Sequence, residues 1–173
     1  MVDIETLGTS MDSQILTIGA IAFDLKTFNT IEEFYKRIDL KSCEDLGLRK
    51  SAVTVRFWES QPKTAKDEAF NPNRVSIRDA MNDFITFWNR NKGDEFWCNG
   101  ANFDEPIIST VFERLGLEKP WKFWNVRCLR TYIDIVGLSM KDFGFTAHHA
   151  LADCKNQVLA YKKATDVLSK YMS

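Results

Sequence analysis

The sequence predicts an α/β protein with a mixed five-stranded sheet, which begins as an antiparallel meander, continues with parallel strands and is flanked by helices. Three extended stretches follow one another within the first 39 residues. Beyond residue 50, helical periodicity alternates with short apolar runs. A chain of 173 residues with 45% hydrophobic content can bury one substantial core, so we assign residues 1–173 to a single domain.

The meander is predicted from three stretches of extended, largely apolar character: residues 1–6, 15–25 and 31–39. The polar pairs Asp12-Ser13 and Asn29-Thr30 lie near the breaks between these stretches. Strands joined by such short connections pair as antiparallel neighbours.

The rest of the chain is predicted to alternate two short strands, at 95–99 and 122–126, with helices at 51–61, 77–88, 104–115, 127–136 and 150–171 and a helical turn at 64–70. Pro62 ends the first helix, because proline cannot continue one. Ser76 and Asp79 form a Ser-x-x-acid start for the second helix. Gly116 suits the end of the third helix.

Charge and cysteine content exclude several classes of protein. Lys and Arg number 23 against 24 Asp and Glu, so bulk positive charge cannot hold a polyanion here. The four cysteines are scattered without a CxxC pattern, which predicts buried thiols in a reducing compartment. No apolar run approaches the ~20 residues of a membrane span, and no signal sequence begins the chain. We therefore expect a cytoplasmic protein without a membrane partner.

Asp3 and Glu5 are the first candidates for a functional site. They lie two positions apart in a predicted strand, so both side chains leave the same face. Like charges so close repel unless a cation lies between them, which predicts a metal ion.

Two further acids lie at predicted helix starts. Asp104 follows the strand at 95–99, where capping of the next helix explains it equally well. Asp153 lies in the first turn of the last helix, where the helix dipole alone favours an acid. His148 and His149, the only histidines, come just before this helix and after the Phe143–Thr146 stretch. A histidine on a loop beside a metal-bound water suits general-base work.

These residues together resemble the DEDDh 3′-to-5′ exonucleases, in the DnaQ-like branch of the ribonuclease-H-like superfamily. The resemblance rests on Asp3-x-Glu5, on Asp104 after Asn-x-x-x-Phe, and on His148 five positions before Asp153, and it extends over nearly the whole chain. The local matches Glu5-Thr6-Leu7-Gly8 and His-x-Ala-Leu-x-Asp are the most specific. Trp58 with Gln61, and Phe123-Trp124-Asn125-x-Arg127, further resemble the phage exonuclease A type.

The resemblance implies a ribonuclease-H-like fold and a two-metal mechanism with Mg²⁺ or Mn²⁺. It implies that Asp3, Glu5 and Asp153 hold one ion, that Asp3 bridges to the second, and that Asp104 helps to position the second. Hard cations of this kind prefer carboxylate oxygens, which fits the acids at these positions. The family spacing selects His148 over His149 as the general base that takes the proton of the attacking water. The product is a nucleoside 5′-monophosphate released from a 3′ end.

Substrate contacts are also implied, at Thr6, Leu7, Phe57, Trp58 and Arg127. Thr6 would meet the terminal nucleotide, Leu7 would wedge against its base, and the two aromatic residues would stack on bases. For at least one of these two aromatic residues, core packing is the better explanation, since 13% of the chain is aromatic. Arg127 and Arg130, three apart on a predicted helix, suit phosphate binding, although a solvated helix face explains them too.

The expected partner is a single strand of DNA with a free 3′ end. RNA or a short oligoribonucleotide is the alternative substrate, since no motif identifies contacts to the sugar 2′ position. A non-catalytic nucleic-acid-binding module of the same fold is a second alternative, and the sequence leaves a homodimer open. Only Met1 and Val2 precede Asp3, so a short first strand is expected to hold the two acids less rigidly.

Overall fold

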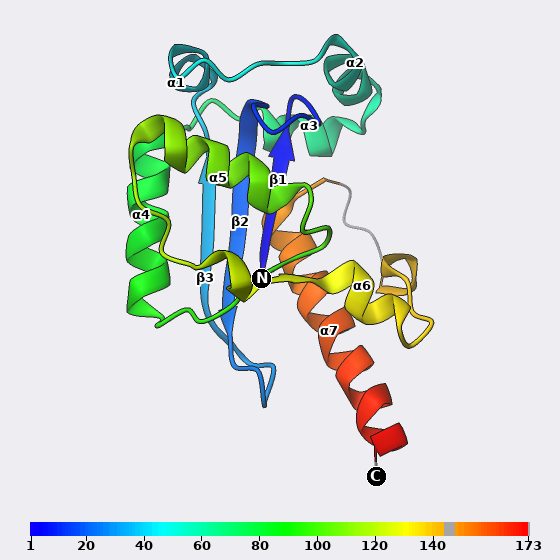
Figure 1. The fold of residues 1–173 in the computed structure, drawn as a ribbon. Helices are drawn as coiled ribbons and strands as arrows, with labels where there is room; N and C mark the ends of the chain where they lie inside the picture. Colours follow the sequence, from blue (N-terminus) through cyan, green and yellow to red (C-terminus); the bar gives the residue numbers. More distant parts are fainter. Residues whose placement is uncertain (144–147, 173) are drawn as a thin grey trace.

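The computed structural model describes residues 1–143 and 148–172. Strands β1 (Val2–Thr6), β2 (Ile15–Phe23) and β3 (Thr30–Arg37) form an antiparallel sheet in the order β1-β2-β3, as predicted (Figure 1). Strand β1 is fixed along its length, because Asp3 pairs with Gly19 and Glu5 with Thr17. The amino group of Met1 also donates to the Ile21 carbonyl oxygen at 2.8 Å.

Strands β4 (Phe96–Cys98) and β5 (Val126–Cys128) form a separate parallel pair. The five strands and their mixed directions confirm the predicted fold class. The strands are divided between two sheets instead of forming one. Strand β4 contacts β1. The amide of Ile4 on β1 donates instead to the Asp104 carboxylate at 3.2 Å. An acidic side chain thus takes a donor that a ladder would otherwise use.

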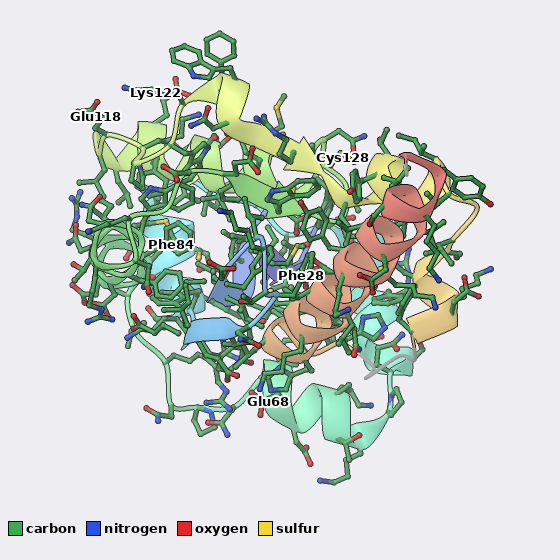
Figure 2. All side chains as sticks on the ribbon, turned by 90° about the horizontal axis from the view of Figure 1, so that it is seen from below. Phe28, Glu68, Phe84, Glu118, Lys122 and Cys128 are labelled. Atoms are coloured by element: carbon green, nitrogen blue, oxygen red, sulfur yellow. The ribbon has the colours of Figure 1, made fainter. Side chains whose placement is uncertain are left out.

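In the described part of the chain, seven α-helices flank the strands: α1 (Leu40–Asp45), α2 (Ala52–Ser60), α3 (Lys63–Ala69), α4 (Ile77–Arg90), α5 (Asp104–Leu115), α6 (Leu129–Asp134) and α7 (Ala150–Met172). Helices α4 and α5 pack on one face of the antiparallel sheet, and α7 packs on the other (Figure 1). On the first face, Phe84 of α4 contacts Phe34 of β3 at 5.5 Å between ring centroids (Figure 2). Within the described residues, no helix is both long and apolar enough to cross a membrane.

Several predicted boundaries are confirmed by their capping contacts. The Ser76 side chain accepts a hydrogen bond from the Asp79 amide at the start of α4. Gly116 ends α5 in the left-handed conformation with φ 65°. The turn predicted at 64–70 is a full helix, α3, which begins directly after Pro62.

Two expectations about the elements are wrong. Helix α1 was not expected, although the Asp39 side chain caps it by accepting from the Ser42 amide. The strand expected at 122–126 is instead a 3-10 turn, η1 (Phe123–Asn125), and β5 begins only at Val126. Aromatic residues suggested a strand there, but Phe123 and Trp124 are exposed and pack into no sheet. As a result α6 begins at Leu129, and Arg127 lies on β5 rather than on a helix with Arg130.

Gly19 brings the start of α7 directly onto β2. A Cβ atom at this position would lie 2.4 Å from the Ala150 carbonyl carbon and from the Leu151 nitrogen. Both neighbours are backbone atoms, so a side chain at Gly19 would force the whole helix start away from the sheet.

We predict that Gly19→Ala lowers both the free energy of unfolding, by about 1–3 kcal/mol, and any activity that depends on the start of α7. Gly116→Ala is the matched control, since it strains a positive φ at about 1–2 kcal/mol but meets no atom within 4 Å. Urea unfolding and turnover, measured on both variants, separate these effects. Equal losses of activity in the two variants would contradict the prediction.

Candidate active site

Three of the predicted carboxylates converge on one face of β1. Asp3 and Glu5 leave this face together because side chains alternate along a strand. Asp153 reaches them from the first turn of α7. One oxygen of each carboxylate lies within 4.8 Å of the others. Such a set of hard oxygen donors is suited to Mg²⁺ or Mn²⁺.

Asp104 approaches the same place from the other side of β1. It is the first residue of α5 and only 3% exposed. Its Oδ1 accepts the hydrogen bond from the Ile4 amide, so the side chain is engaged with β1 rather than limited to capping α5. The charge of Asp104 also contributes to raising the pKa of Asp3, which shows that the two acids interact.

Burial and mutual repulsion make the four acids hard to ionise. The pKa of Asp3 is raised well above its usual range, mainly by burial and then by the charges of the other three acids. Burial with the charges of Asp153 and Asp104 raises the pKa of Glu5 to about 8. Burial raises the pKa of Asp153 to about 6 and also raises that of Asp104, against the opposing effect of the Ile4 amide. The cluster therefore needs protons or cations to neutralise it.

Three of the four acids, all except Asp104, line a cavity of about 200 Å³. Its lining residues come from β1, from the end of β4, from the η2 turn (Met140–Phe143) and from the start of α7: Asp3, Ile4, Glu5, Asn99, Met140, His148, Asp153 and Gln157. A larger cavity of about 400 Å³ lies at the opposite end of β1, beside Met1 and Trp88. Among the described residues only the set on β1 and α7 brings three potential metal ligands together, so the chemistry belongs to the smaller cavity.

The two histidines point to different surroundings. His148 lines the cavity, with its Nδ1 4.0 Å from Glu5 Oε2, and burial lowers its pKa. His149 stacks on Tyr35 at 4.8 Å between ring centroids, and its Nδ1 accepts from the Ala152 amide. The geometry therefore brings His148 to the acids and ties His149 to the surrounding structure. Of the loop expected before them, residues 144–147 lie outside the described residues.

Comparison with known proteins identifies the family. The model of the 3′-5′ exoribonuclease Rv2179c-like domain matches residues 1–165. The chain belongs to this family.

Two relatives agree with this Rv2179c-like assignment. The exodeoxyribonuclease of Enterobacteria phage T4 is 29% identical over an alignment 200 positions long, which covers 95% of this chain and 87% of the phage protein. The nuclease domain of 3′hExo, described as a DEDDh family member bound to rAMP, has the same fold with a TM-score of 0.60 and 12% identity. That match covers 95% of this chain and 90% of the other. The protein is a 3′-to-5′ exonuclease, and its fold is that of a DEDDh nuclease domain, as its sequence predicts.

In this Rv2179c-like domain the two predicted stacking residues are not equivalent. Phe57 is 43% exposed, and its ring contacts His148 at 5.1 Å. Trp58 is 2% exposed, and its Nε1 donates to the Thr6 carbonyl oxygen at 2.9 Å. The ring of Trp58 therefore fills the core and supports β1, which is the packing alternative that the sequence leaves open for one of the pair. Phe57 presents a free face beside the cavity.

The remaining predicted substrate contacts are also constrained. Leu7 is 3% exposed within a cluster around Trp58 and Leu16, so its side chain offers no free surface for wedging against a base. Thr6 is buried as well, with its hydroxyl donating to the Gly8 carbonyl oxygen at 2.6 Å. Arg127 forms an ion pair with Glu95 at 3.0 Å and donates to the Trp124 carbonyl oxygen. Arg127 is not among the described residues that line the cavity.

Sequence reasoning missed Gln157 and Asn99 near the acids, and it considered Arg130 only as a phosphate contact. Gln157 donates from Nε2 to Asp3 Oδ1 at 2.7 Å. Asn99 lines the cavity, and its buried Oδ1 lacks a partner among the described residues. Arg130 donates to the Asn99 carbonyl oxygen at 3.0 Å, and its charge acts on Asp104 to lower that pKa. Gln157 lies four positions after Asp153 in the predicted last helix. This helical spacing is the signal that could have identified it.

We predict that the protein without metal loses stability as pH rises. The folded pKa of Glu5 lies above its ordinary value of 4.5, so the folded state binds more protons than the unfolded state between about pH 4.5 and 8. The free energy of unfolding therefore decreases as pH rises through this window. In Glu5→Gln this decrease is expected to be smaller by roughly 2–4 kcal/mol. Urea unfolding in chelator at pH 5 and pH 8 measures the effect.

Glu118→Gln is the matched control, because the Glu118 side chain is 90% exposed at the outer surface (Figure 2). This variant is expected to retain the full loss of stability between the two pH values. A pH-independent stability in the wild-type protein would contradict the prediction.

Proposed function

We propose that the protein removes nucleotides one at a time from the 3′ end of single-stranded DNA, releasing nucleoside 5′-monophosphates with two divalent cations. One observation carries this proposal. The oxygens of Asp3, Glu5 and Asp153 converge within 4.8 Å in a cavity that His148 also lines.

The residues present fit a pair of hard cations. Asp3, Glu5 and Asp153 would hold Mg²⁺ or Mn²⁺ directly. Asp104, on the other side of β1, would help to position the second ion. Bound cations of this kind supply an activated water and neutralise charge on the scissile phosphate. His148 would take the proton of the attacking water, for which its lowered pKa keeps the imidazole neutral near pH 7.

A single strand is the substrate that fits the free aromatic surface. Phe57 lies beside His148 with 43% of its surface exposed, and stacking on such a ring tolerates every base.

The choice of DNA rests on the phage relative. That protein is an exodeoxyribonuclease and aligns with 95% of this chain. RNA is the second candidate, because the matching family model is described as an exoribonuclease domain. A binding module that retains the fold without turnover is the third possibility, and the carboxylate cluster argues against it. We also propose a reducing, cytoplasmic location, since the four cysteines are all free thiols.

Matched DNA and RNA oligonucleotides with labelled 3′ nucleotides test the substrate. With Mn²⁺ or Mg²⁺, we expect labelled mononucleotide to be released faster from DNA than from RNA. Asp3→Ala is expected to release none, because it removes a carboxylate common to the acid cluster. Equal or faster digestion of RNA would overturn the DNA preference, and retention of strands without any product would support the binding module.

His148→Ala is predicted to lower kcat by about 10²–10⁴-fold, the usual contribution of a general base. His149→Ala is predicted to retain kcat within about tenfold while losing stability through its Tyr35 contact, roughly 1 kcal/mol. Turnover and thermal melting of both variants check this assignment. A large loss of kcat in His149→Ala with little loss in His148→Ala would reverse it.

A further inference from the structure

We propose that Gln157 is a positioning residue that orients the Asp3 carboxylate toward the divalent cations. The proposal rests on the proposed two-metal function and adds a residue to it. Helix α7 would then supply both a metal ligand, Asp153, and the hydrogen bond that fixes a second ligand on β1.

The geometry links the two ends of the chain. Gln157 lies one turn beyond Asp153 on α7, so both side chains leave the helix on the same side. Its Nε2 donates to Asp3 Oδ1 at 2.7 Å, and the residue is 2% exposed. Asp153 and Gln157 both line the cavity, together with Asp3. The hydrogen bond is therefore short, buried and inside the site.

The chemistry of the pair fixes the direction of the amide. An ionised carboxylate only accepts hydrogen bonds, so the NH₂ group of Gln157 must face Asp3. The other end of the amide then has no compensating contact, since the buried Oε1 has no partner among the described residues. Burying an unpaired carbonyl oxygen is unfavourable, and an apolar side chain of the same length would avoid it. Glutamine at this position therefore supplies a donor to Asp3 and leaves its own carbonyl oxygen unpaired among the described residues.

Asp3 is the acid that most needs such support. The charges of Asp104, Glu5 and Asp153 all act on it, and their repulsion favours rotation of the side chain away from the cluster. Pairing of β1 with β2 fixes the backbone of Asp3 but leaves its side-chain torsions free. A bond to one oxygen holds the carboxylate and leaves the second oxygen available to cations.

A neutral donor suits this role better than a charged one. Lysine at this position would also donate to Asp3, but its charge would neutralise the carboxylate and compete with the metal. Glutamine holds the carboxylate while leaving its negative charge in the site. Hydrogen-bond partners behind metal ligands elsewhere contribute about 10–100-fold to metal affinity or activity.

Gln157→Met tests the proposal, since methionine keeps the length of the side chain and removes the donor. Thermal melting is followed as Mn²⁺ is titrated into chelator-treated protein, a readout independent of turnover. We expect the Mn²⁺ concentration for half-maximal stabilisation to rise by about 10–100-fold. In turnover assays at fixed Mn²⁺, we expect kcat to fall while KM for the oligonucleotide stays unchanged.

Gln14→Met is the matched control. Gln14 is also 2% exposed, but its Nε2 donates to the Leu48 carbonyl oxygen rather than to an acid. Its Mn²⁺ midpoint is expected to equal that of the wild type. If Gln157→Met does not fold, Gln157→Leu provides the same measurement with a smaller apolar side chain.

The outcomes distinguish this proposal from the proposed function. A wild-type protein that neither melts higher with Mn²⁺ nor releases nucleotides would overturn the function itself. A wild-type response with an unchanged Mn²⁺ midpoint in Gln157→Met would overturn only the positioning role. An equal shift in Gln14→Met would also overturn it, because the effect would then be general loosening.

Discussion

Repulsion among Asp3, Glu5, Asp104 and Asp153 is the constraint around which the rest of the structure is arranged. These acids come from β1, α5 and α7, and burial adds to their mutual repulsion. No short segment could hold them together, because a flexible chain would let them separate. The sheet and its two covering helices supply the rigidity that the cluster requires. Gly19 contributes by allowing α7 to lie directly on β2.

The strands are divided into two sheets beside one of these acids. Asp104 takes the amide hydrogen bond of Ile4, on the strand that lies between β2 and β4. The fold therefore replaces part of a sheet with a contact that places a carboxylate. A hydrogen bond from a backbone amide also stabilises the ionised form of that acid, which favours retaining its charge for a cation.

Spacing rules identified the acids because their separations are local properties of strands and helices. Side chains two positions apart on β1 point to the same face of the strand, and this relation does not depend on what surrounds the strand. Phe57 and Trp58 show where such rules end. Both lie on α2, and only the packing of distant Thr6 decides which ring is buried. Arg127 shows a second limit, since β5 has three residues, too few for a periodic signal to mark where the strand ends and α6 begins.

The adjacent histidines show how packing gives two identical side chains different surroundings. His149 stacks on Tyr35, whose hydroxyl donates to Glu68 of α3 at 2.7 Å. That chain of contacts ties the start of α7 to β3 and α3. His148 has a positive φ of 55°, a conformation that costs a residue other than glycine roughly 1–2 kcal/mol. Such strain persists only where neighbouring contacts over-determine the backbone. The His148 ring itself contacts Phe57 at 5.1 Å and Trp58 at 5.6 Å between ring centroids, so α2 holds this imidazole beside Glu5 while β3 holds the ring of His149.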